Sequence, residues 1–173
     1  MYESHFPHKR YKHTIEFLEQ HIPTGSQILD LGVVNPFTEI MENHGYKVKN
    51  TTGEDLDIDT SAIENSDDEI VTAFEIFEHL LSPFTVLKAI KAKKLVASVP
   101  LKLWFASAYR SKTDMRDRHY HEFEDWQFDW LLEKTGWQIK ARHKWTNPTK
   151  KLGIRPLLRQ FTPRYYIVYA ERV

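Results

Sequence analysis

Apolar side chains recur at helical spacing near the start of the chain, with polar side chains between them. The apolar positions are Tyr11, Ile15, Leu18 and Ile22. A repeat every three to four residues predicts an amphipathic helix over about residues 9–21. Pro23 and Gly25 follow directly, and because both residue types end helices, the helix is bounded on its carboxyl side.

Three further helices are predicted where a capping residue precedes an apolar repeat. Asn35 can cap a helix that begins at Pro36, because its side chain accepts a hydrogen bond from a free backbone N–H and proline suits the first turn. The other two helices are expected to begin at Ser82 and at about Asp125. Gly136 ends the last of them, since glycine favours the position just beyond a helix.

Short apolar runs between these helices predict six strands. They cover residues 27–31, 46–50, 69–74, 94–100, 137–145 and 164–172. The run at 69–74 is apolar and partly β-branched, which is typical of a strand buried on both faces. Residues 51–68 are irregular, although "DLDID" alternates with period two and can form a brief edge strand.

Strands that alternate with helices indicate a parallel sheet covered on both faces, and two consecutive final strands indicate an antiparallel edge. The predicted fold class is therefore α/β. In such sheets ligands bind outside the carboxyl ends of the strands. A binding site is expected just after Leu31, Asn50, Phe74 and Val99.

Composition narrows the class of protein. A chain of 173 residues with 41% hydrophobic content can bury one core, so one domain is expected. No run of 18 apolar residues occurs and the start is polar, so we expect a cytoplasmic protein with no membrane segment. The absence of cysteine excludes disulfides, thiolate metal sites and a cysteine nucleophile.

Charge is segregated along the chain although the formal net charge is zero. Every charged side chain from Thr51 to Ser82 is acidic, and from Gln138 onward nearly all are basic. Two solvated faces of opposite sign explain this pattern, and so does a basic lobe that faces an anionic partner. The basic stretch lacks an RNA-binding motif, so no nucleic-acid partner is expected.

Four short motifs occur in order: "ILDLG" at residues 28–32, "EIFEH" at 75–79, "SVP" at 98–100 and "HYHEF" at 119–123. In this order they resemble the class I S-adenosylmethionine-dependent methyltransferases, in particular the small single-domain group similar to methyltransferase types 11 and 23. The resemblance implies a Rossmann-like sheet of seven strands with an antiparallel last strand. It also implies S-adenosylmethionine as the cofactor and a small molecule as the methyl acceptor.

The resemblance assigns cofactor-binding roles to residues of this chain. Gly32 matches the first glycine of the cofactor loop, whereas Val34 and Pro36 stand where two more small residues are expected, so the glycine-rich loop is degenerate. Glu54 is the nearest carboxylate for the ribose hydroxyls, and Asp55 and Leu56 match the adenine segment. The full predicted set is Asp30, Gly32, Val34, Asn35, Glu54, Asp55, Leu56, Phe74 and Glu75.

Catalysis of methyl transfer requires alignment more than strong acid–base groups. If a general base exists, we expect His79 or His119. No metal ligands are assigned, although His119 and His121 have a spacing that a metal-dependent hydrolase can use. A second alternative is an inactive methyltransferase-fold protein that acts as a scaffold and binds an anionic partner through its basic lobe.

One methyltransferase-like domain over residues 1–173 is the expected organisation. Within it, residues 1–23 form the N-terminal helix, and residues 24–100 form the cofactor-binding half. Residues 101–173 form the substrate and lid half, which includes a basic insertion at 146–163.

Overall fold

The computed structural model describes residues 8–148 and 152–173, so residues 1–7 and residues 149–151 of the basic insertion lie outside the described part. Its centre is a six-stranded sheet in the order β2-β1-β3-β4-β6-β5. The strands are β1 (Gln27–Asp30), β2 (Lys47–Asn50), β3 (Ile70–Phe74), β4 (Lys94–Pro100), β5 (Trp137–Thr146) and β6 (Pro163–Arg172). All six lie where the hydrophobic pattern predicts strands.

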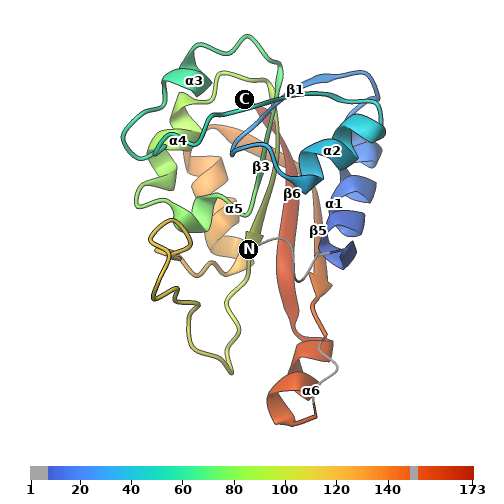
Figure 1. The fold of residues 1–173 in the computed structure, drawn as a ribbon, viewed down its shortest axis with the longest axis vertical. Helices are drawn as coiled ribbons and strands as arrows, with labels where there is room; N and C mark the ends of the chain where they lie inside the picture. The colour runs from blue at the N-terminus through green and yellow to red at the C-terminus, as the bar shows by residue number, and fades with distance from the viewer. Residues whose placement is uncertain (1–7, 149–151) are drawn as a thin grey trace.

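Helices cover both faces of this sheet (Figure 1). On one side lie α1 (His8–His21) and α2 (Pro36–Asn43), and on the other lie α3 (Ser61–Glu64), α4 (Pro83–Ala89) and α5 (Asp125–Lys134). A 3₁₀ helix, η1 (Phe77–His79), follows β3, and α6 (Ile154–Phe161) lies at the far tip of the hairpin formed by β5 and β6. Among the described helices, none is both long and apolar enough to cross a bilayer.

Strand directions agree with the α/β prediction. The pairs β1–β2, β1–β3 and β3–β4 are parallel, and β6 runs antiparallel to both β4 and β5. The predicted seventh strand is wrong. In the described part of the chain, residues 51–69 form turns and the short α3, because too few residues are available for another strand and its connections.

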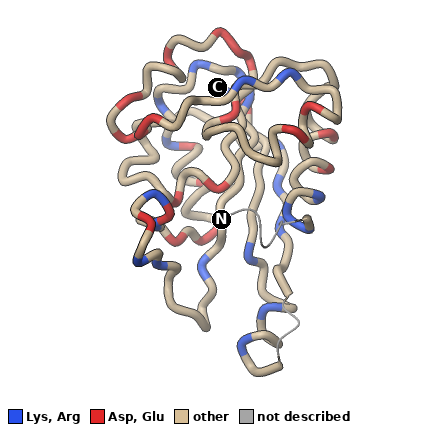
Figure 2. The backbone as a smooth tube through the Cα atoms, in the orientation of Figure 1, with Lys and Arg blue, Asp and Glu red and all other residues tan. Residues whose placement is uncertain are grey.

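Two details of the irregular and basic segments also differ from expectation. Residues 55–59 form a turn instead of an edge strand, and the Asp57 carboxylate accepts hydrogen bonds from the backbone N–H groups of Leu81 and Ser82, at 2.7 and 2.8 Å. The segment 146–163 contains α6, whose amphipathic repeat is only eight residues long. Figure 2 shows basic residues on α6 and acidic residues along the connection from β2 to β3.

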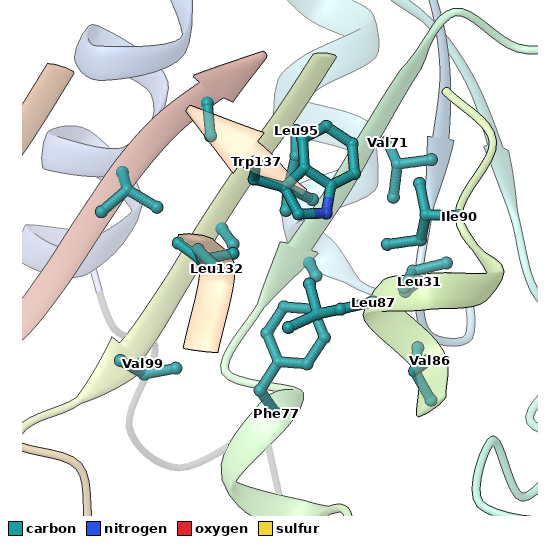
Figure 3. Packing of buried hydrophobic residues seen from close by; sticks show 14 of the residues in the cluster. Leu31, Val71, Phe77, Val86, Leu87, Ile90, Leu95, Val99, Leu132 and Trp137 are labelled. Carbon is teal, nitrogen blue, oxygen red and sulfur yellow. The ribbon is translucent and has the colours of Figure 1, made fainter. Parts of the chain in front are cut away.

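Side chains from both faces of the sheet form two buried clusters. The larger lies between the sheet and the helices α3 to α5, and Figure 3 shows Leu132 and Trp137 packed with Leu95 and Phe77 in it. The smaller lies beneath α1 and α2. Both clusters hold the carboxyl ends of β1, β3 and β4 rigidly in place, because buried side chains on either face restrict each strand.

Candidate functional site

A cleft of about 830 Å³ opens at the carboxyl ends of β1, β3 and β4. This is the edge at which doubly wound sheets bind ligands. Its walls come from α1, the loop between β1 and α2, the segment from β3 to η1, and the long connection between β4 and α5. The lining residues are Arg10, Tyr11, Thr14, Asp30, Leu31, Gly32, Val33, Val34, Asn35, Pro36, Phe37, Gly53, Phe74, Glu75, Ile76, Glu78, His79, Ser98, Asp114, Arg116, Asp117 and His119.

The loop after β1 is open towards this cleft. Gly32 has a φ of +129°, a backbone conformation that glycine adopts most easily, and its N–H donates a hydrogen bond of 2.8 Å to Thr51 Oγ1. Val34 is 74% exposed, so its side chain does not fill the interior of the cleft. Asn35 caps α2 by accepting a hydrogen bond from the Phe37 N–H, and this ends the loop.

Asp30 is a buried carboxylate at the end of β1. It accepts hydrogen bonds from Thr72 Oγ1 at 2.6 Å and from Asn50 Nδ2 at 3.0 Å. Burial raises the pKa of Asp30 to about 7, because the two hydrogen bonds only partly offset the loss of hydration. Asp30 thereby ties the end of β1 to its two neighbouring strands.

Asn50 stands at the end of β2, where the resemblance requires a carboxylate for the ribose. Its amide points inward and also donates to the Gly32 carbonyl at 3.1 Å. Asn50 was not predicted, because the search for a ribose partner was for a carboxylate and Glu54 is the first one after the strand. The signal was nevertheless present, because Asn50 is the last residue of the strand predicted over residues 46–50.

The three residues expected near the ribose and adenine do not line the cleft. Oε2 of Glu54 accepts hydrogen bonds from the N–H and Oγ1 of Thr52, at 2.7 and 3.0 Å. Asp55 accepts from the Asp57 N–H, and Leu56 is buried in the larger core cluster. Their roles in cofactor binding stay predictions, whereas Asp30, Gly32, Val34, Asn35, Phe74 and Glu75 are brought together around the cleft.

Glu75 lies directly after β3 in a left-handed conformation with φ of +59°. One carboxylate oxygen accepts a hydrogen bond from Ser98 Oγ at 3.0 Å, and the other lies 3.5 Å from Arg10 Nη1. Burial raises the pKa of Glu75, while the positive charge of Arg10 lowers it. The strained backbone aims this carboxylate at the cleft, and such strain is concentrated at functional sites. Arg10 comes from α1, and no motif in the sequence marks it as a partner of Glu75.

Two predicted histidines meet on the same wall. The rings of His79 and His119 lie edge to face with centroids 4.8 Å apart, and Glu78 Oε1 lies 3.6 Å from His79 Nε2. Burial lowers the pKa of His119, and the nearby His79 adds to this effect. Burial raises the pKa of Glu78 well above its usual value, with a further contribution from Glu75.

Backbone hydrogen bonds bring these histidines together across 40 residues of sequence. The carbonyl of Glu78 accepts from the N–H groups of Tyr120 and His121, at 2.8 and 3.2 Å. His121 itself turns away, and its Nε2 lies 3.3 Å from the Leu81 carbonyl. The pairing of His119 and His121 suggested by their spacing is therefore replaced by a cluster of His119 with Glu78 and His79.

Similarity to solved structures extends over nearly the whole chain. A protein provisionally assigned as an S-adenosylmethionine-dependent methyltransferase from Listeria monocytogenes is 15% identical, with 95% of this chain and 98% of that chain covered and a TM-score of 0.63. The 1,6-didemethyltoxoflavin-N1-methyltransferase of Burkholderia thailandensis is 14% identical, with 94% and 78% covered and a TM-score of 0.63. A SAM-dependent methyltransferase from Archaeoglobus fulgidus is 13% identical, with 94% of both chains covered and a TM-score of 0.58.

The chain has the fold of the S-adenosylmethionine-dependent methyltransferases. This confirms the Rossmann-like α/β class expected from the motifs. No protein-family model matches the sequence, and no curated protein matches it significantly. The similarity to methyltransferases therefore lies in the arrangement of helices and strands, because sequence identity to these structures is only 13–15%.

Proposed function

We propose that the protein is an S-adenosylmethionine-dependent methyltransferase that acts on a small molecule. The observation that carries this proposal is the cleft of about 830 Å³ between the Gly32 loop and Glu75. Small-molecule and cofactor sites occupy about 300–1,000 Å³, so the cleft has room for a cofactor with part of an acceptor. It also lies at the carboxyl edge of the sheet, where this fold class binds ligands.

The residues present fit the cofactor in part. The open Gly32 loop would hold the methionine portion, with Val34 and Asn35 beside it, and Glu75 would face its ammonium group across the end of β3. Asn50 holds the loop in place, because its side-chain amide donates hydrogen bonds to both the Asp30 carboxylate and the Gly32 carbonyl. Glu54 does not line the cleft, so its side chain would have to turn towards the cleft to accept hydrogen bonds from the ribose hydroxyls. Asp55 and Leu56 would flank the adenine.

When bound, S-adenosylmethionine supplies a methyl group that its sulfonium already activates, so the chain needs to orient the acceptor and exclude water. His79 and His119 also line the cleft, where either can take a proton from the acceptor. Support for a small acceptor comes from the Burkholderia thailandensis enzyme, whose structure holds 1,6-didemethyltoxoflavin together with S-adenosylhomocysteine.

Calorimetric titration with S-adenosylmethionine and S-adenosylhomocysteine tests the proposal directly. We expect saturable binding of both compounds by folded protein at sub-millimolar concentration. Absence of binding at millimolar cofactor, with the fold verified by circular dichroism, would exclude a methyltransferase.

A scaffold that binds an anionic partner is the second candidate function. Two observations favour it: Asn50 replaces a carboxylate at the end of β2, and α6 exposes apolar side chains beside Arg155 and Arg159 at the hairpin tip. On α6 these are Ile154, Leu157 and Phe161, and the exposed Leu152 lies just before the helix. A scaffold predicts no cofactor binding and partner affinity that falls as salt rises, so the same titration separates the two functions.

A further inference from the structure

We propose that Glu78, His79 and His119 bind a divalent transition-metal ion on the wall of the cleft. One ligand atom from each of these residues lies within 4.8 Å of the other two. All three residues line the cleft, so an ion held between them can reach a molecule bound there. Methyl transfer does not require this ion, and with the ion bound the lone pairs of His79 and His119 are no longer available to take a proton from an acceptor.

Glu78 gives the first reason to expect a cation. Its side chain is 1% exposed, and its Oε2 atom has no hydrogen-bond partner among the described residues. A buried carboxylate with an unpaired oxygen is destabilising unless a proton or a cation compensates its charge. The nearest basic group, His79, contacts only the other oxygen, Oε1, at 3.6 Å.

His79 is held in the tautomer that suits a metal ligand. Its Nδ1 lies 3.0 Å from the carbonyl oxygen of Arg118, which can only accept, so Nδ1 carries the proton. In the neutral ring Nε2 then has a free lone pair, and that lone pair faces Glu78 Oε1. A proton or a metal ion between these two atoms removes the repulsion between their electron pairs. A histidine that donates its other N–H to a backbone carbonyl is the usual arrangement around a bound metal.

His119 completes the set from a different part of the chain. Its side chain is largely buried, and its Nδ1 makes no hydrogen bond in the described structure, although Oε1 of Glu122 lies 3.4 Å away. The Glu122 carboxylate is itself held by the Tyr109 N–H at 2.8 Å. Glu122 can therefore orient the His119 ring from behind, as carboxylates do for histidines that bind metals.

The donor set indicates the class of ion. Two imidazoles and one carboxylate suit Zn²⁺, Co²⁺, Mn²⁺ or Fe²⁺ better than Ca²⁺ or Mg²⁺, which prefer oxygen ligands throughout. Bonds of about 2.0–2.2 Å at tetrahedral angles place ligand atoms about 3.3–3.6 Å apart, so the cluster, whose ligand atoms lie within 4.8 Å of one another, has to close by about 1 Å. Three protein ligands leave positions open towards the cleft, where an oxygen or nitrogen atom of a bound acceptor can coordinate.

Titration of tag-free, chelator-treated protein with Co²⁺ and Zn²⁺ tests the site, with calorimetry and the visible absorption of Co²⁺ as readouts. We expect one ion per chain and a rise in melting temperature when it binds. Glu78→Gln should lower the affinity by more than about 100-fold, because loss of a ligand costs more than the roughly 10–100-fold lost with a residue that only orients a ligand. The same variant should keep the stability of the metal-free protein, since the glutamine amide has nearly the same size and shape as the carboxyl group that it replaces.

His121→Gln is the matched control, because His121 lies in the same segment but outside the cluster. It should bind Co²⁺ like the wild type. Binding at the separate pair His13 and His143, whose rings lie 5.6 Å apart, would survive Glu78→Gln and would overturn the proposal. Failure of the wild type to bind either ion would also overturn it and would assign a proton to Glu78. Because no cofactor is present in this titration, its outcome is separate from that of the methyltransferase test.

Discussion

At the scale of single residues, Asp30 illustrates how burial changes the chemistry of a carboxylate. It is enclosed at the junction of β1, β2 and β3, and burial raises its pKa to about 7. Thr72 and Asn50 bind its two oxygens. The side chain thus links three strands beneath the cleft at the cost of holding a proton that the unfolded chain would release.

Asp30→Asn should change how stability depends on pH. In the wild type the folded chain keeps the proton up to about pH 7. The unfolded chain releases the proton near pH 4. The stabilisation that comes from protonated Asp30 is therefore complete below pH 4 and is lost as the pH rises towards 7, which lowers the free energy of unfolding by up to about 4 kcal/mol. Urea unfolding at pH 4.5 and pH 7.5 should show a smaller loss in the variant. Identical pH dependence in both proteins would contradict the raised pKa.

Gly32→Ala should weaken cofactor binding beyond its effect on stability. An added Cβ would meet only Ile76 Cδ1, at 3.5 Å, so the methyl group would enter the cleft. We expect affinity for S-adenosylhomocysteine to fall at least about tenfold, since one tenfold step corresponds to 1.4 kcal/mol. The control is Gly25→Ala, at a glycine that also has a positive φ, of +87°, that has open space around an added Cβ and that does not line the cleft. Both variants should lose about 1–2 kcal/mol of stability, but only Gly32→Ala should lose affinity.

At the scale of secondary-structure elements, α2 forms because its first turn is satisfied by side chains. Asn35 accepts from the Phe37 N–H at 2.9 Å, and Thr38 Oγ1 accepts from the Asn35 N–H at 3.2 Å. Pro36 has no N–H to satisfy in this turn. This reciprocal cap also ends the loop that lines the cleft, so the helix and the site share one boundary.

Asn35→Ala should destabilise the protein by about 1 kcal/mol, because a backbone N–H of the first turn loses its partner. Chemical denaturation measures the change. Glu42→Ala on the exposed side of the same helix should remain within about 0.5 kcal/mol of the wild type. Equal effects of the two substitutions would show that the cap does not stabilise α2.

At the scale of the whole molecule, Arg172 joins the last strand to two helices. Its guanidinium donates to the carbonyls of Thr135, just after α5, and of Ile90, just after α4. It also stacks over the Trp137 ring at 4.0 Å. A positive group at the carboxyl ends of two helices satisfies carbonyls that have no partner within the helix and complements the helix dipoles.

Arg172→Lys should lower the free energy of unfolding by about 2 kcal/mol, because a single ammonium cannot replace the planar fork that contacts both carbonyls. Urea unfolding provides the measurement. Lys140→Ala removes an exposed ion pair with Glu171 on the same pair of strands and should cost less than about 1 kcal/mol. If Arg172→Lys lowered the free energy of unfolding no more than Lys140→Ala does, Arg172 would not be one of the residues that hold the helices to the sheet.

The periodicity of the sequence determined which segments became helices and strands. Three features depend only on residues that are close in sequence: the helical spacing in α1, the Asn35 cap of α2 and the apolar run of β3. They can therefore be predicted without knowledge of the fold. The short α3 escaped detection because four residues hold no apolar repeat, and α6 because Gly153 marks a helix start less clearly than Asn35 or Ser82 followed by proline. The motifs also indicated the methyltransferase fold, which the structure confirms.

Only the tertiary structure decided which side chains meet. Glu78 and His119 are brought together by hydrogen bonds from the Tyr120 and His121 N–H groups to the Glu78 carbonyl, which no local pattern predicts. Asn50 reaches Asp30 and Gly32 because β1 and β2 lie side by side in register. Local periodicity records how each segment buries its own apolar side chains, whereas the site depends on contacts between segments that are distant in sequence.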